Sequence, residues 1–144
     1  MKVEILKQFS VFMPNRPGAL SGLARIFSDK GINVLGLASE VRDDSGVVRI
    51  AVAADADVSA ILSQGGFSSV ETSLLSVDLD GKPGELFRIA KALADGKINI
   101  TTVYGSSASS GGISRILINV ENVQKARALL ASLAAAAAEQ QSAG

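Results

Sequence analysis

Apolar and polar residues alternate along residues 3–13, and this period of two predicts a β-strand with one buried face. The turn sequence 14–18, which contains two prolines and a glycine, ends the strand. Over residues 19–30 the apolar positions instead recur every three or four residues, a spacing that predicts a helix with a single apolar stripe. The chain therefore begins with a strand, a tight turn and a helix.

Two β-rich segments follow at residues 32–42 and 47–54, and the polar turn 43–46 between them predicts a hairpin. A short helix is expected over residues 57–64 and a further strand over residues 67–79. The resulting order of strand, helix, strand, strand, helix and strand is a βαββαβ unit. Its helices are expected to cover one face of an antiparallel sheet, because each helix has only one apolar stripe to bury.

The whole pattern occurs a second time, 66 positions further along the chain. Pro17-Gly18 returns as Pro83-Gly84, and Ile32-Asn33-Val34 returns as Ile98-Asn99-Ile100. Further matches at the same offset pair Leu20 with Leu86, Leu23 with Ile89, Ala24 with Ala90, Arg49 with Arg115, Ile50 with Ile116 and Val52 with Ile118. Self-similarity at a fixed period indicates a repeat architecture, so we predict an α+β fold of two βαββαβ units.

The two units differ at their ends. We assign residues 1–70 to the first unit and residues 71–133 to the second. The second unit lacks a final strand, because the Ala-rich residues 134–144 have neither strand periodicity nor β-forming residues and are expected to be a disordered tail. Residues 3–6 begin with the same Val-Glu pair as the segment that joins the units, and we expect them to supply the missing edge strand.

Composition narrows the class of function. Of the 144 residues 47% are hydrophobic, but no run approaches the roughly 18 apolar residues of a membrane span, and the first residues lack a secretory signal. We therefore expect a cytoplasmic protein with no membrane partner. Fourteen basic and fourteen acidic residues balance without a block of either sign, which argues against a nucleic-acid partner.

The chain contains no cysteine and no histidine. This composition excludes disulfides, thiol and Ser-His nucleophiles, and nearly all zinc and haem sites. The chemistry that remains rests on carboxylates, Lys, Arg, hydroxyl groups, one Tyr and backbone amides, which suit binding better than bond breaking. We expect a non-catalytic protein without a cofactor or a metal.

Two features of the repeat could bind a ligand. Residues 15–20 place unpaired backbone N–H groups at a helix start, where hydrogen bonds and the helix dipole both favour a carboxylate or phosphate. The Pro-Gly pair could equally do no more than shape the turn. Asn33 and Asn99 each begin the second strand of a unit, so each could face a ligand or simply tolerate the bent entry into the strand.

The segment Asn15-Arg16-Pro17-Gly18-Ala19-Leu20, followed by Gly31-Ile32-Asn33-Val34, resembles the ACT domain, a small βαββαβ module that binds amino acids and regulates metabolism. The resemblance covers both units, and so nearly the whole chain except the tail. It implies ferredoxin-like units that pair side by side so that their antiparallel sheets join, with the helices on one face. Effectors would be held between the first turn of one unit and the second strand of the other.

By position, the resemblance implies a ligand site formed by Asn15, Arg16, Gly18, Ala19 and Leu20, which face Asn99 and Ile100. A weaker mirror site would use Lys82, Gly84, Glu85 and Leu86, which face Asn33 and Val34. The mirror site departs from the family pattern, since Gly81 stands where the family has Asp or Asn. In addition, the Glu85 carboxylate would compete with a ligand carboxylate for the same helix dipole. We therefore favour the first site.

Two further groups of residues have two interpretations each. Tyr104 and the serines that follow it could line a pocket, or they could be a packed strand residue and a hairpin tip. Arg49 and Arg115, which repeat in the third strand, could pair with effector carboxylates or stand solvated on the sheet face.

The resemblance implies an allosteric protein whose partners are a small-molecule effector, an amino acid, and a metabolic enzyme or regulator, and it is compatible with a homo-oligomer. Two alternatives stay open. One is a structural or protein-interaction module without a ligand. The other is an acylphosphatase-like hydrolase on the same fold, although the Pro-Gly turn does not resemble the phosphate loop of that family.

Overall fold

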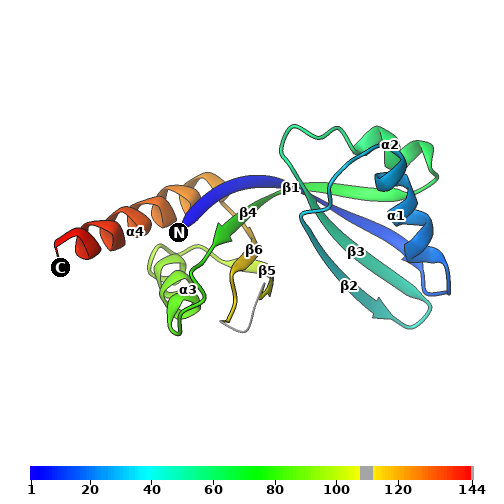
Figure 1. Cartoon of the computed structure of the whole chain (residues 1–144). Coiled ribbons are helices and arrows are strands. Elements are labelled where there is room, and N and C mark those ends of the chain that lie inside the picture. The colour runs from blue at the N-terminus through cyan, green and yellow to red at the C-terminus, as the bar shows by residue number, and fades with distance from the viewer. Residues whose placement is uncertain (108–111, 144) are drawn as a thin grey trace. The chain divides into compact units, whose positions relative to one another are not determined.

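The computed structural model describes residues 1–107 and 112–143. Its elements are β1 Lys2–Pro14, α1 Ala19–Asp29, β2 Gly36–Arg42, β3 Ser45–Val52, α2 Ser59–Gln64, β4 Ser68–Asp78, α3 Glu85–Asp95, β5 Ile100–Ser106, β6 Arg115–Val120 and α4 Val123–Ala143. The strand order is β2-β3-β1-β4-β6-β5, and the pairs with a defined register run antiparallel (Figure 1). The α+β class expected from the sequence is confirmed.

The chain divides into two compact units. The N-terminal unit is Leu6–Ser73, and the C-terminal unit combines Met1–Ile5 with Leu74–Gly144. The long strands β1 and β4 therefore contribute residues to both units. The first residues of the chain belong to the C-terminal unit, where the partly buried side chains of Val3 and Ile5 pack against the core. The domain boundaries expected from the sequence stay a prediction.

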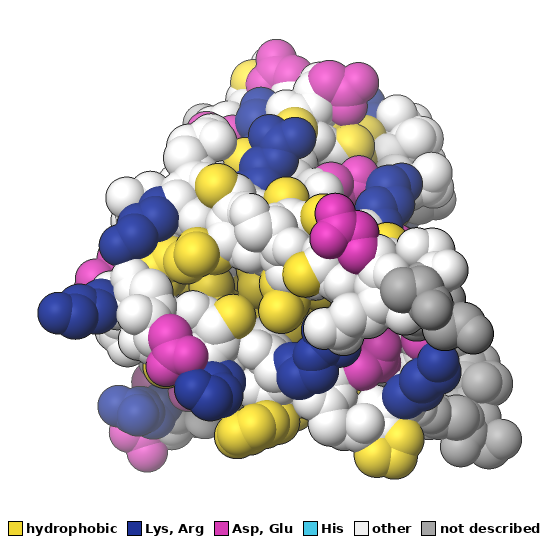
Figure 2. All heavy atoms as spheres, turned by 90° about the vertical axis from the view of Figure 1, so that its left-hand side faces the viewer, with side chains coloured by type: hydrophobic (Ala, Val, Ile, Leu, Met, Phe, Trp, Pro, Cys, Tyr) yellow, Lys and Arg dark blue, Asp and Glu magenta, His cyan; other side chains and the backbone are white. Residues whose placement is uncertain are grey.

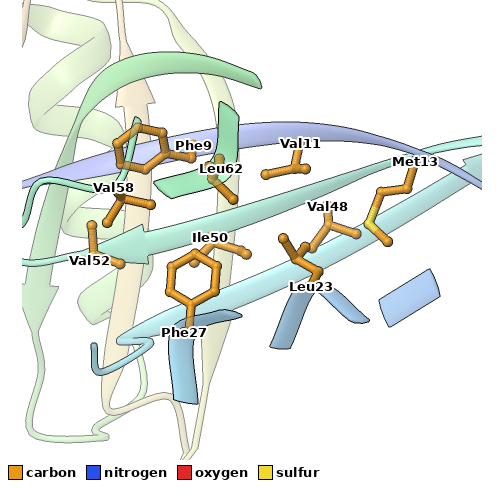
Figure 3. Packing of buried hydrophobic residues seen from close by; sticks show 10 residues of the cluster. All are labelled: Phe9, Val11, Met13, Leu23, Phe27, Val48, Ile50, Val52, Val58 and Leu62. Atoms are coloured by element: carbon orange, nitrogen blue, oxygen red, sulfur yellow. The ribbon is translucent and has the colours of Figure 1, made fainter. Parts of the chain in front are cut away.

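The core of the N-terminal unit lies between one face of its strands and its two helices (Figure 3). Phe9 pairs with Ile50 and Val11 with Val48, so the alternate residues of β1 and β3 share this face. The buried cluster consists of Phe9, Val11 and Met13 from β1, Val48, Ile50 and Val52 from β3, Leu23 and Phe27 from α1, and Val58 and Leu62 at α2. The helical spacing and the strand alternation thus meet in one apolar layer.

The C-terminal unit is built in the same way. Its buried cluster consists of Leu75 and Val77 from β4, Ile116 and Ile118 from β6, Ile89 and Leu93 from α3, Ala126 and Leu130 from α4, and Ile98 before β5. The pairs Leu75 with Ile118 and Val77 with Ile116 place these residues on one face of the strands. In both units, therefore, the helices cover a single face of the sheet.

Both α1 and α3 begin at a glycine with a left-handed backbone. Gly18 has a φ of 88° and Gly84 a φ of 91°, with ψ values of −12° and −13°. Any other residue would be strained in this conformation, which is why glycine is needed where the chain turns from the strand into the helix. Neither helix start has a side-chain cap.

Both helices also end in the same way. The N–H of Ile32 donates to the Phe27 carbonyl and that of Ile98 donates to the Leu93 carbonyl, each at 2.9 Å, which closes the helix end after a left-handed residue. Gly31 is that residue after α1, with a φ of 67°, but Lys97 occupies the position after α3 with a φ of 60°. The two helix ends therefore share one backbone conformation, but only the first has glycine at the left-handed position.

The strand that follows α1 begins later than the sequence predicts. Asn33 and Val34 lie before β2, which starts at Gly36, because sheet pairing begins only where the Leu35 N–H donates to the Ala51 carbonyl at 2.8 Å. The residues before that point carry the chain from the helix layer to the sheet layer. The expectation that Asn33 begins a strand is therefore wrong.

Helix α4 continues to Ala143 and includes residues for which the sequence predicts a disordered tail. Alanine has the highest helix propensity of all residues, which favours this continuation. In the described part of the chain, no helix combines the length and the hydropathy that a membrane span requires.

Replacing Lys97 with glycine is expected to stabilise the C-terminal unit by about 1 kcal/mol, because glycine adopts the left-handed backbone without strain. The single tyrosine, Tyr104, lies in β5, so its fluorescence during urea denaturation reports on this unit. The reciprocal change Gly31→Lys should destabilise the N-terminal unit by a similar amount, measured by circular dichroism. An unchanged urea midpoint for Lys97→Gly would contradict the backbone argument.

Replacing both Val3 and Ile5 with alanine is expected to lower the stability of the C-terminal unit by about 2 to 3 kcal/mol, because these side chains pack against its core. Tyr104 fluorescence in urea measures the change. Lys2→Ala, at an exposed neighbouring position of the same strand, is the control and should shift stability by less than about 0.5 kcal/mol. If the double variant unfolds at the same urea concentration as the control, β1 does not complete this unit.

Candidate functional site

The turn between β1 and α1 is anchored to the hairpin turn of its own unit. The backbone N–H of Asn15 donates to the Asp44 carbonyl at 2.9 Å, and Asn15 Nδ2 donates to the Asp43 carbonyl at 3.2 Å. Asn15 thus holds the turn in place through its side-chain amide. Its Oδ1 accepts no hydrogen bond from the described residues and stays available to a ligand ammonium group.

The start of α1 presents free donors. The backbone N–H groups of Gly18, Leu20 and Ser21 have no acceptor among residues 1–107 and 112–143. The first turn of α1 contains no acidic residue. Together with the positive end of the helix dipole, these N–H groups can hold a carboxylate.

Arg16 adds a cation to the same turn. Its side chain is exposed and makes no ion pair within the described part of the chain. A guanidinium group can donate two parallel hydrogen bonds to a carboxylate, which makes arginine well suited to this task.

A pocket of about 100 Å³ lies beside this turn. Four of the residues predicted for the first site line it, namely Asn15, Arg16, Ala19 and Leu20. The turn residues therefore meet around one hollow, with Gly18 in the adjacent backbone.

The sequence analysis missed the opposite wall of this pocket, which consists of β-strand residues. Ser39 and Val41 of β2 line it together with Val48 of β3. Ser39 pairs with Val48, and Val41 with Gly46, so all of these positions lie on the face that α1 covers. The signal was present in the hairpin register, which follows once the turn at residues 43–44 is located.

The equivalent turn in the C-terminal unit is occupied by a carboxylate of the chain itself. Glu85 Oε1 accepts from the Asp80 N–H at 3.2 Å, and Glu85 Oε2 accepts from the Lys82 N–H at 3.1 Å. Lys82, Gly84, Glu85 and Leu86, the residues predicted for the turn half of the mirror site, all line a pocket of about 420 Å³. The site is thus larger than its counterpart, and the Glu85 carboxylate binds the loop before the helix. The N–H groups of Gly84, Leu86 and Phe87, which correspond to those of Gly18, Leu20 and Ser21, are not its donors.

The strand halves of the two predicted sites lie apart from the turn of their own unit. Asn99 is exposed and immediately precedes β5, and Ile100 begins that strand and packs against the core. Asn33 and Val34 are exposed in the connection before β2. The pairing of each strand half with the turn of the other unit stays a prediction.

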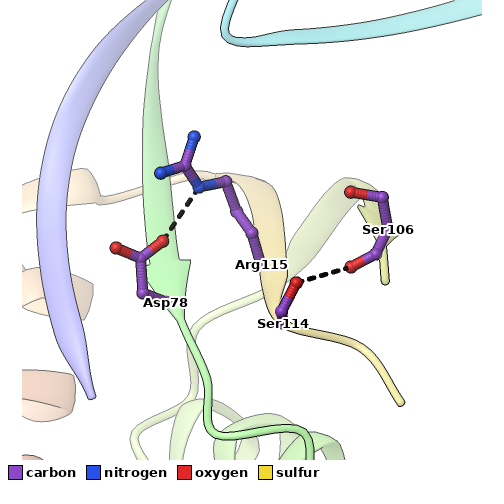
Figure 4. Close-up of polar contacts among 4 residues, drawn as sticks. All are labelled: Asp78, Ser106, Ser114 and Arg115. Atoms are coloured by element: carbon purple, nitrogen blue, oxygen red, sulfur yellow. Dashed lines mark hydrogen bonds and ion pairs between the residues drawn. The ribbon is translucent and has the colours of Figure 1, made fainter. Parts of the chain in front are cut away.

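The repeated arginines have partners within their own units. Arg115 Nε is 2.8 Å from Asp78 Oδ1, a residue directly opposite it on β4 (Figure 4). Arg49 Nη1 is 3.1 Å from Glu40 Oε2 on β2. Since each guanidinium already has a carboxylate, neither arginine is free to bind an effector without breaking an ion pair.

The second hairpin is anchored below its tip. Ser114 donates to the Ser106 carbonyl through its backbone N–H at 3.0 Å and through Oγ at 3.4 Å (Figure 4). Tyr104 is half-buried on β5 opposite Leu117. The expected hairpin tip at residues 108–111 lies outside the described residues.

A metal centre has no support in the described residues, which contain no cluster of three or more His, Cys, Asp or Glu side chains. The two turns instead offer amides, a guanidinium and an ammonium group. Their chemistry is that of anion recognition.

Among solved structures, a protein from Bacteroides thetaiotaomicron is similar over 90% of this chain and 89% of its own, with a TM-score of 0.78 and 21% identity. The ligand-free regulatory subunit of aspartate kinase from Thermus thermophilus is similar over 91% of this chain and 94% of its own, with a TM-score of 0.63 and 16% identity. E. coli aspartokinase III in complex with lysine and aspartate is similar over 88% of this chain and 30% of its own, with a TM-score of 0.54 and 12% identity.

At these identities the likeness is one of fold. No curated protein sequence matches the chain significantly. The ACT domain model matches residues 7–64, which contain the turn, α1 and the hairpin described above, and this match confirms the resemblance found in the sequence. The matched segment spans 58 of the 144 residues and lies within the N-terminal unit.

Proposed function

We propose that this chain is a non-catalytic regulatory protein that binds a small amino acid at the turn Asn15–Leu20 of its ACT domain. Asn99 and Ile100 of the C-terminal unit would complete the site from the other side. The proposal places the protein in the cytoplasm and gives it a metabolic enzyme or regulator as partner. It is supported by the family match and by the likeness in fold to a regulatory subunit of aspartate kinase.

The observation that carries the proposal is the set of free donors at the start of α1. An α-carboxylate could accept from the N–H groups of Gly18, Leu20 and Ser21, with Arg16 close to the same turn. The ammonium group of the ligand could donate to Asn15 Oδ1. Residues 15–21 thus contain backbone N–H groups, a guanidinium group and a side-chain amide oxygen, which together could bind the carboxylate and the ammonium group of an amino acid.

The pocket beside the turn limits the size of the effector side chain. Its volume of about 100 Å³ holds about three water-sized groups, if each takes about 30 Å³. Leu20, Val41 and Val48 make much of its lining apolar. These properties favour an amino acid with a short side chain.

We propose that the mirror site does not bind an effector in the unmodified chain. Lys82, Gly84, Glu85 and Leu86 could hold a second effector against Asn33 and Val34, but the Glu85 carboxylate lies in the same turn and would repel a ligand carboxylate. A chain would therefore bind one effector equivalent.

Regulation would follow from a ligand that contacts both units. Such a ligand favours the relative arrangement in which both halves of the site are in place, and a partner that distinguishes this arrangement senses the ligand. The size of the effect is bounded by the difference in ligand affinity between the arrangements.

Isothermal titration calorimetry with each common amino acid is expected to show binding of a small amino acid with a stoichiometry near one. Arg16→Gln should weaken this binding about tenfold, because a charge-assisted hydrogen bond contributes about 1.5 kcal/mol or more. Arg25→Gln is the matched control, since Arg25 lies on α1 and pairs with Asp29. Absence of heat with every amino acid would favour the alternative of an interaction module without a ligand.

Glu85→Ala is expected to raise the stoichiometry from one effector to two, because it removes the carboxylate that would repel a ligand carboxylate at the start of α3. Asp95→Ala, at the other end of α3, removes a comparable carboxylate and should leave the stoichiometry unchanged. The same calorimetric titration measures both variants. A stoichiometry of two in the unmodified chain would refute the blocking role of Glu85.

A further inference from the structure

The C-terminal unit contains a second hollow, which shares the turn residues Lys82, Gly84 and Glu85 with the predicted mirror site but lies on the α4 side of that turn. It has a volume of about 400 Å³ and lies between the first turns of α3, the C-terminal half of α4 and Met1. Leu79, Ile89 and Leu133 contribute apolar lining. Figure 2 views the molecule from the side on which α4 ends, where hydrophobic side chains gather in a hollow and both basic and acidic side chains stand around it.

The hollow exists because α4 presents small side chains to it. Ala134, Ala137 and Ala138 line it, so the helix backbone forms a wall without filling the space. The ring of Phe87 lies at the same hollow and is 69% exposed, the largest value among the exposed large hydrophobic residues. A solvent-exposed aromatic side chain beside an apolar cavity is typical of a binding surface.

Two cationic and two acidic side chains line the hollow. Lys82 and Arg88 line it and make no ion pair within the described residues. Two carboxylates line it as well, but that of Glu85 is engaged by two backbone N–H groups. This leaves Asp80 as the single free carboxylate against two free cations.

We propose that this hollow binds a small monoanionic amphipathic molecule, a carboxylate on an apolar body of about eight carbons. The carboxylate lies between Lys82 and Arg88, and the apolar body lies against Leu79, Leu133 and the alanines of α4. Asp80 disfavours a second negative charge on the ligand. This site uses the α4 side of the turn that precedes α3 and is independent of amino-acid binding at Asn15–Leu20.

The chemistry predicts a graded selectivity that calorimetry can measure on the full chain. Octanoate should bind, and each methylene added from butanoate to octanoate should raise the affinity about fourfold, because the apolar body is removed from water. Octylamine should bind at least tenfold more weakly, since its cation faces Lys82 and Arg88. Octanedioate should also bind at least tenfold more weakly, because its second carboxylate enters an apolar wall.

Two variants, each with a control, locate the site. Ala137→Leu fills the hollow and should weaken octanoate binding at least tenfold, whereas Ala136→Leu, on an exposed position of the same helix that does not line the hollow, should leave it unchanged. Arg88→Gln should weaken octanoate about tenfold without affecting octanol. Arg16→Gln should leave octanoate binding intact, which separates this proposal from the amino-acid site.

Three outcomes would overturn the proposal. Octanoate could give no heat at millimolar concentration, octylamine could bind as well as octanoate, or Ala137→Leu could bind octanoate as well as Ala136→Leu does. None of these results bears on amino-acid binding at Asn15–Leu20. Conversely, if no amino acid binds, the proposed function fails, but the octanoate titrations still test the hollow at α4 independently.

Discussion

A strand that turns within a few residues into a helix over its own sheet requires a residue with a left-handed backbone. Gly18 and Gly84 fill this position in the two units, with φ values of 88° and 91°. Glycine has no side chain with which to cap the helix that it begins. The first N–H groups of the helix therefore lack a side-chain acceptor from the capping residue, and such a helix start favours an anion.

The two units differ in the side chain at the first position of this helix. In the C-terminal unit Glu85 supplies a carboxylate to the loop that leads into α3. In the N-terminal unit Ala19 occupies the matching position, and the donors of α1 stay free. The two turns thus share a backbone conformation and differ in one side chain, which in the C-terminal unit binds the turn itself. The helix ends differ in a similar way, because the left-handed position is glycine at Gly31 and a strained lysine at Lys97.

The end of the chain adds a second difference between the units. In the N-terminal unit α2 is followed by strand β4, whereas α4 continues as an Ala-rich helix to Ala143. The small side chains of this helix face the start of α3 across an apolar hollow instead of filling it. The turn before α3 consequently lines two hollows, one of about 420 Å³ and one of about 400 Å³.

Although they missed the start of β2 and the length of α4, periodicity and local backbone chemistry were sufficient to predict most of the strands and helices and the Pro-Gly turn. These features depend on neighbours within a few residues, so the sequence by itself determined them. Only the tertiary structure decided that Ser39 and Val41 wall the pocket at Asn15–Leu20, and that the Asp78 carboxylate engages Arg115. Those contacts join residues far apart in the chain, and they depend on how α1 packs on the sheet, on the pairing of β4 with β6 and on side-chain rotamers, which no local pattern encodes.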